Sequence, residues 1–146
     1  EWDDGAQSFT LQPFARVDRV DSERSHADLR EALYQASGGP LTVRIGVGQV
    51  FWGITEARHV VDIINQTNLV ENPEQEDKLG QPMINATLYD DTWGNVDLFV
   101  LPWFRERVFP GRHGRLRTTP RVLNRDILYS DDSKRKRIDV AARWSH

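Results

Sequence analysis

Glu56, His59 and Asp62 combine two carboxylates with an imidazole at intervals of three residues. On a helix this spacing places the three side chains along one side, where they could bind a divalent metal or transfer protons. Asp62, six residues after Glu56, would lie partly off the helix face that Glu56 and His59 share, and no second histidine lies nearby. We therefore favour a polar stripe facing water or the interior of a pore, with a metal-dependent hydrolase as the weaker alternative.

The element that would carry this stripe is short. Ala57, Val60, Val61 and Ile64 have the spacing of one apolar helix face, and Thr55 precedes them as a capping residue. The sequence predicts one short helix there, within an inserted helix and loop segment that spans residues 54–82.

Most of the remaining chain alternates apolar and polar residues with a period of two. The pattern covers residues 9–18, 41–48, 95–102 and 138–145. Successive side chains of a strand point to opposite faces, so each segment has one apolar and one polar face. The expected strands are 9–20, 41–51, 83–90, 95–107 and 134–146, with a tight turn at 91–94 joining two of them.

Residues 27–36 allow two interpretations. Leu29, Ala32, Leu33 and Ala36 match helical spacing, whereas Ala27 and Leu29 alternate with charged neighbours. A strand with a bulge near Glu31 would reconcile the second pattern, and we favour it because good strands flank the segment. It would be the sixth strand.

Composition excludes several classes of protein. The chain has 146 residues, no cysteine and a net charge of -3, which gives no case for disulfides, thiolate metal sites or binding to nucleic acid. A mean hydropathy of -0.60 and the lack of a long apolar run exclude a transmembrane helix. The hydrophobic fraction of 38% is low for a soluble core, but it suits strands with one face in water.

Two architectures fit this alternation. In a transmembrane β-barrel the apolar faces meet lipid, and the long charged loops at one end oppose short turns at the other. Trp52, Trp93 and Trp103 would then mark the membrane boundaries. In the alternative, a soluble β-sandwich that binds carbohydrate, the same tryptophans would be stacking platforms and the apolar faces would pack together.

A resemblance favours the barrel. Residues 43–53 read VRIGVGQVFWG and residues 59–66 read HVVDIINQ; they resemble uncharacterised porin-like barrels of Gram-negative outer membranes. The runs KLGQP at 78–82 and LPWFRER at 101–107 continue the likeness, which covers about half the chain. The resemblance implies an all-β antiparallel meander with an inward-folded segment. Since a barrel closes with eight or more strands, five or six imply an internal section of a larger barrel.

We therefore expect residues 1–146 to form a single section of an outer-membrane barrel that passes small solutes, without catalysis, metal or cofactor. Its expected partners are outer-membrane lipid, an unidentified small solute and, as a candidate, a second copy of the chain. Arginine makes up 16 of the 19 basic residues, which suits paired Arg and Asp on the polar faces. Ion pairs along the wall are the favoured role of these arginines, and attraction of anions is the alternative. The expected lining and constriction residues are Arg16, Arg44, Glu56, Arg58, His59, Asp62, Asp97, Arg105, Asp139 and Arg143.

Overall fold

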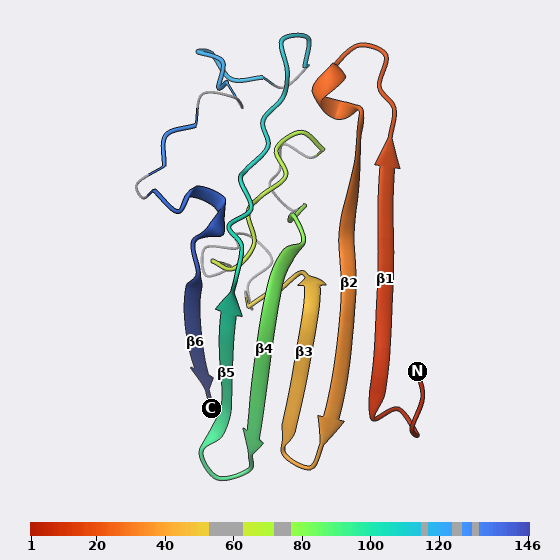
Figure 1. Ribbon diagram of the computed structural model, residues 1–146, viewed down its shortest axis with the longest axis vertical. Helices are drawn as coiled ribbons and strands as arrows, with labels where there is room; N and C mark the ends of the chain where they lie inside the picture. The colour runs from red at the N-terminus through yellow and green to blue at the C-terminus, as the bar shows by residue number, and fades with distance from the viewer. Residues whose placement is uncertain (53–62, 72–76, 115–116, 124–126, 130–131) are drawn as a thin grey trace.

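Six strands form one antiparallel sheet in the order of the chain (Figure 1). The computed structural model describes residues 1–52, 63–71, 77–114, 117–123, 127–129 and 132–146. The elements are β1 (Gln7–Arg16), η1 (Ser22–Arg24), β2 (His26–Gly38), β3 (Leu41–Gly48), β4 (Gln81–Asp90), β5 (Gly94–Leu101), η2 (Lys134–Lys136) and β6 (Asp139–Ser145). The prediction of an all-β antiparallel meander is confirmed. The sheet is open, because β1 and β6 each pair along one edge only.

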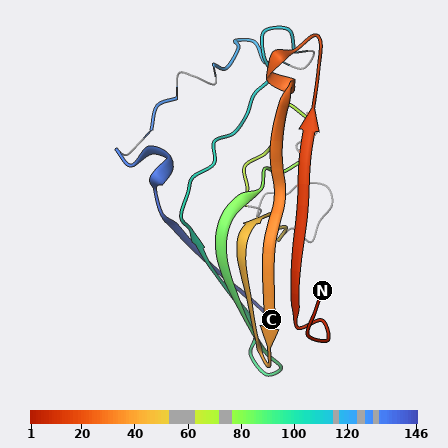
Figure 2. The same cartoon turned by 45° about the vertical axis from the view of Figure 1, so that its right-hand side comes forward.

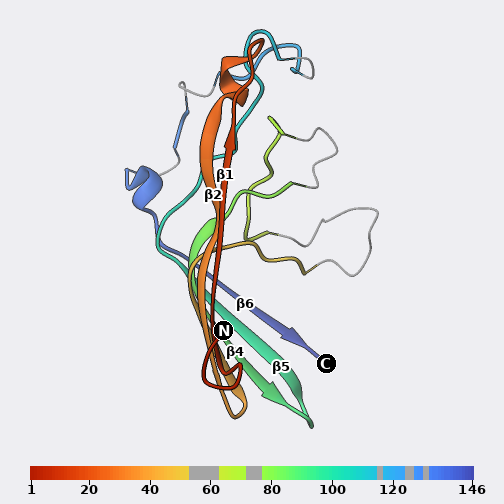
Figure 3. The same cartoon turned by 90° about the vertical axis from the view of Figure 1, so that its right-hand side faces the viewer.

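The connections differ sharply between the two ends of the sheet. Residues 39–40 and 91–93 make tight turns at one end, where both termini also lie (Figure 1). Residues 17–25, 49–80 and 102–138 make the long connections at the other end. Seen from the side, the described parts of 49–80 project from one face of a bent, twisted sheet (Figures 2 and 3).

Four strands are shorter than predicted. A competing hydrogen bond explains where β1 ends, and a missing backbone donor explains where β5 ends. β1 stops at Arg16, because the Asp18 carboxylate accepts hydrogen bonds from the backbone N–H groups of Val20 and Asp21. β5 stops at Leu101, where Pro102 has no N–H to continue the ladder. β3 ends at Gly48, and β6 begins only at Asp139, after the single turn of η2.

The predicted helix at 57–64 lies almost entirely outside the described residues. Ile63 and Ile64, at its end, are not helical. Within the described ranges the helical elements are the two three-residue 3-10 helices η1 and η2. The inward-folded helix is thus not part of the described fold.

Residues 26–38 form one strand, and its bulge explains the ambiguous pattern of the sequence. Gln12 pairs with Glu31 while Pro13 pairs with Leu29, so Arg30 is the extra residue. The bulge reverses the alternation, which puts Leu29 and Leu33 on opposite faces although they are four residues apart. The interpretation as a bulged strand is confirmed.

The strand register sorts the side chains into two faces. What we call the apolar face is typified by one row of directly opposite residues across all six strands: Phe9, Tyr34, Ile45, Ile84, Val100 and Val140. The adjacent row belongs to what we call the polar face: Ser8, Gln35, Arg44, Asn85, Phe99 and Ala141.

The two faces are covered very differently. On the polar face, Ile64 from the β3–β4 connection packs with Met83, Phe99 and Leu101 in a small hydrophobic cluster. On the apolar face the large side chains are exposed, and Phe9, Ile45 and Val140 are 52%, 48% and 77% accessible. The segment that folds back over the sheet therefore covers the polar side.

Candidate functional site

The centre of the polar face is a hydrogen-bonded network around Arg44. Its guanidinium donates to the amide oxygens of Gln35 at 2.8 Å and Asn85 at 3.3 Å. Asn85 is completely buried, and its amide nitrogen donates to the Leu98 carbonyl at 3.1 Å. Such a buried polar network is stable only when its members are hydrogen-bonded, as these are. It fixes a positive charge in the middle of the polar face.

A second polar group extends from Asn85 toward β6. The Thr87 hydroxyl donates to the Asp97 carboxylate at 2.7 Å. Arg143 lies directly opposite Asp97 in the register, but its guanidinium carbon lies 5.7 Å from the ring centre of Trp52. Arg143 thus interacts with an aromatic ring rather than with the carboxylate opposite it.

Two ion pairs join distant parts of the chain near the end that carries the long connections. Arg16 of β1 pairs with the buried carboxylate of Glu71, and His26 lies 3.9 Å from the same carboxylate. Arg105 pairs with Asp28 of β2, and its guanidinium also donates to the carbonyl of Gly80 at 2.7 Å. These contacts tie the β3–β4 and β5–β6 connections to the first hairpin.

Asn65 holds the β3–β4 connection against the sheet. Its side-chain amide donates to the carbonyls of Gly48 and Leu79, both at 2.8 Å, and accepts from the backbone N–H of Val50 at 2.8 Å. Because Asn65 is buried, these bonds replace the water that the same groups would otherwise need. The connection is therefore pinned at the point where it leaves β3 and where it returns to β4.

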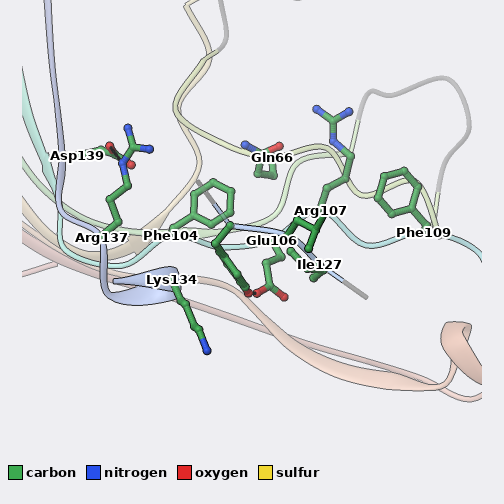
Figure 4. A pocket seen from close by; sticks show the side chains of 11 residues that line it. Gln66, Phe104, Glu106, Arg107, Phe109, Ile127, Lys134, Arg137 and Asp139 are labelled. Atoms are coloured by element: carbon green, nitrogen blue, oxygen red, sulfur yellow. Dashed lines mark hydrogen bonds and ion pairs between the residues drawn. The ribbon is translucent and has the colours of Figure 1, made fainter. Parts of the chain in front are cut away.

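A cavity of about 420 Å³ lies where β5 ends and β6 begins. Phe104 and Gln66 occupy its middle, with Arg137 and Asp139 on one side and Arg107 and Phe109 on the other (Figure 4). A neighbouring cavity of about 270 Å³ shares Gln66, Phe104, Arg137 and Asp139. Together they form a recess with an aromatic floor and charged walls.

On one wall of this recess, the Glu106 carboxylate accepts hydrogen bonds from two other side chains. Arg135 donates two hydrogen bonds to its carboxylate, both of 2.6 Å, and the Tyr129 hydroxyl donates to it as well. The hydrogen bond and the negative charge of Glu106 raise the pKa of the Arg135 guanidinium above its ordinary value. On the opposite wall Arg137 donates to Asp139 at 2.8 Å. Both walls can offer hydrogen bonds to a polar solute while an apolar part of it rests on Phe104.

The structure describes six of the ten expected lining residues. Glu56, Arg58, His59 and Asp62 lie outside the described residues, as does the metal interpretation built on three of them. In the described part of the chain, none of the other six pairs with another of the six. The expected ladder of ion pairs is therefore not found among these six residues. Arg44 donates to amides, Arg143 lies over an aromatic ring, and Arg16 and Arg105 pair with Glu71 and Asp28.

Some residues that shape the polar side were missed by the sequence analysis. Asn85 is an uncharged residue within a strand, and its alternation with Ile84, Ala86 and Leu88, which places it on the other face, was the one available signal. Glu71 and Glu106 belong to connections, where the alternation of a strand gives no guidance. Their roles depend on which distant arginine they meet.

No family model, curated protein or solved structure matches this chain. Across the described residues there is no helix with the length and apolar character needed to cross a membrane.

Proposed function

We propose that this chain is a section of the wall of an outer-membrane β-barrel that lets small polar solutes pass. The observation that carries the proposal is the inverted distribution of side chains. Large apolar residues of five of the six strands, all but β2, are exposed on one face, whereas Asn85, Thr87 and Gln81 are buried on the other. In water an apolar face of this extent would have to be covered, but in a bilayer it faces hydrocarbon.

Charge is absent from the part of the sheet that would meet lipid. In the paired rows of the apolar face, the one charged residue is Asp90, which lies at the β4–β5 turn. β1 and β4 each contain 10 residues, and a tilted transmembrane strand needs about 9–11. β3, β5 and β6 are shorter, with 8, 8 and 7 residues, so β1 and β4 are the strands whose length matches a bilayer crossing.

Aromatic residues mark the ends of this apolar surface. Trp144 is 66% exposed on β6, and its indole N–H donates to the carbonyl of Trp93 at 2.7 Å. Trp103 follows β5 at the opposite end and is also exposed. Tryptophan favours the boundary of a membrane, where its ring meets lipid and its N–H finds a polar partner.

The two open edges indicate how the wall would be completed. β1 and β6 run antiparallel to each other, because the sheet has an even number of strands in a meander. Further strands of the barrel, from the same protein or from a second copy, would pair at both edges and leave no backbone group unpaired in lipid. The polar face would then line the pore, and the recess at Phe104 would lie at one mouth.

The β-sandwich alternative requires a second sheet against the apolar face. Within the described ranges the strands form one sheet, and Trp93 and Trp103 lie at opposite ends of β5. Trp52 instead packs against Phe99 on the polar side, with the ring centres 5.4 Å apart. The three tryptophans do not make one stacking platform for a sugar.

The test uses two tryptophans on opposite faces. The protein, reconstituted into vesicles that contain brominated lipid, should lose tryptophan fluorescence through Trp144, so Trp144→Phe should remove part of the quenching. Trp52→Phe is the matched control and should leave the quenching unchanged, because Trp52 lies on the polar side. Equal quenching losses in both variants, or no quenching at all, would overturn the location in lipid.

Solute passage is measured separately. Vesicles that contain the protein should swell in an iso-osmotic solution of a small sugar faster than vesicles without protein. A protein that is quenched by lipid but gives no swelling would retain the membrane location and lose the transport role.

A further inference from the structure

The β5–β6 connection concentrates positive charge in a chain whose net charge is negative. From Arg107 to Arg125 the sequence contains six arginines and one histidine, and no Asp, Glu or Lys. Four of these seven residues line one open cavity of about 540 Å³: Arg112, His113, Arg117 and Arg121. Among the residues that the structure describes, no acidic side chain lines it.

The loop that carries these residues is fixed by a buried carboxylate. Asp21 accepts a hydrogen bond from the backbone N–H of Gly111 at 3.1 Å and one from the N–H of Glu23 at 3.3 Å. The loop closes on itself through a hydrogen bond of 3.1 Å from the N–H of Gly114 to the carbonyl of Gly111. The cavity thus stands on an anchored turn.

Glycine at positions 111 and 114 lets the backbone of the loop approach the Asp21 carboxylate closely. A Cβ atom at Gly111 would lie 2.2 Å from one oxygen of Asp21, and a Cβ at Gly114 would lie 2.6 Å from the other. The carboxylate of Asp21 therefore lies directly against the backbone of this loop and accepts hydrogen bonds from N–H groups. Among the described residues, no guanidinium group is paired with it.

No described residue forms an ion pair with Arg112, Arg117 or Arg121, and all three are exposed. Elsewhere on the molecule, arginines such as Arg16 and Arg105 meet carboxylates. Three unpaired guanidinium groups around one cavity repel one another, and a multivalent anion relieves that repulsion. The planar guanidinium donates two parallel hydrogen bonds to phosphate, which ammonium groups cannot match.

We propose that this cavity binds a ligand carrying two or more phosphate groups. One phosphate group carries about two negative charges, fewer than the positive charges of the three guanidinium groups around the cavity, so a ligand that links two or more phosphates matches them better. The shared chemistry is a linked pair of phosphate groups, whether it belongs to a soluble compound or to the head group of a lipid with two phosphates. The inference does not rest on the proposed pore, since such a ligand binds from solution.

The probe for the soluble source is pyrophosphate, titrated calorimetrically into the protein. The variant Arg112→Gln/Arg117→Gln/Arg121→Gln should weaken binding roughly tenfold or more, because it removes the charge-assisted hydrogen bonds. The control Arg19→Gln/Lys134→Gln/Lys136→Gln removes the same number of exposed charges elsewhere and should change affinity less than about twofold. Arg117→Lys should give an intermediate loss, because it keeps the charge without the paired donors.

The probe for the lipid source is a vesicle of cardiolipin, which links two phosphates in one head group, in phosphatidylcholine, compared with phosphatidylcholine alone. Binding to pyrophosphate or to the anionic vesicle that the cavity variant weakens and the control does not supports the proposal. The arm that responds identifies the source of the phosphate. Absence of binding in both arms, or equal losses in the cavity variant and the control, overturns it. Neither result affects the quenching of Trp144, so failure here is distinguishable from failure of the proposed membrane function.

Discussion

Ile45 and Ile84 lie directly opposite each other on β3 and β4, and nearly half of each side chain is exposed, at 48% and 45%. One residue earlier on β3, Arg44 lies opposite Asn85, which is completely buried. Two adjacent pairs of one strand ladder thus show an apolar exterior and a polar interior. This inversion sets the expected behaviour of substitutions on the two faces.

A positive charge in the middle of the apolar face should be costly if lipid covers it. Leu98→Arg should lower the free energy of unfolding in a bilayer by about 2–4 kcal/mol, because the guanidinium would have to leave water. Val17→Arg, at an exposed position just after β1, should change it by less than about 0.5 kcal/mol. The measurement is urea unfolding of both variants in vesicles, and a small effect of Leu98→Arg would speak against contact with hydrocarbon.

Removing the buried amide of the polar face should also destabilise the chain. Asn85→Ala leaves the Leu98 carbonyl without its side-chain donor and removes one acceptor of Arg44. The expected loss of unfolding free energy is about 1–3 kcal/mol. Asn95→Ala is the control within the same sheet, since no side-chain hydrogen bond of Asn95 is described. Equal effects of the two alanines in urea titrations would contradict the role of the network.

Gly46 should not tolerate a side chain. Its φ of 136° is in the region that disfavours L residues, and a Cβ would lie 2.1 Å from the carbonyl oxygen of Ala32. Gly46→Ala should therefore cost about 2 kcal/mol or more. Gly38→Ala meets no atom within 4 Å, and it should be neutral or stabilising by up to about 1 kcal/mol. Thermal unfolding of the two variants tests this, and similar midpoints would refute it.

Deleting the extra residue of the bulge should preserve the two faces. Without Arg30, Leu29 is followed by Glu31 and the alternation of β2 becomes regular, so the expected cost is the lost contact of Arg30 with Phe14, about 1 kcal/mol. Deleting Leu33 instead moves every following side chain of β2 to the wrong face and should abolish folding. Circular dichroism and urea unfolding of the two deletions compare them directly. A folded Leu33 deletion would show that register is not set by the faces.

The loop after β1 should loosen at low pH. Backbone N–H groups of Asp21 and Val20 donate to the Asp18 carboxylate, and with the charge of Arg24 they lower its pKa below the ordinary value of 3.8. Because the folded pKa is the lower one, its contribution to stability is fully present above about pH 3.8 and is lost as the pH falls through the folded value. An NMR titration of the Asp18 carboxyl should give a midpoint below 3.8, and an unshifted midpoint would contradict the hydrogen bonds.

The sequence by itself determined the strands and their two faces. Alternation with a period of two is a local property, so the positions of five strands and the turn near 91–94 were predictable, and the bulged sixth strand was the favoured one of two interpretations. The residues at which the strands end were harder to predict. A side chain such as Asp18 competes for the backbone there, and alternation does not record that competition.

Only the tertiary structure decided which residues meet on the polar side. Arg105 and Asp28 are separated by 77 residues, and Arg16 and Glu71 by 55. Their pairing depends on how the long connections fold back over the sheet, and no periodicity encodes that path. The strands follow from local geometry, whereas the partner of each charge follows from contacts between distant segments.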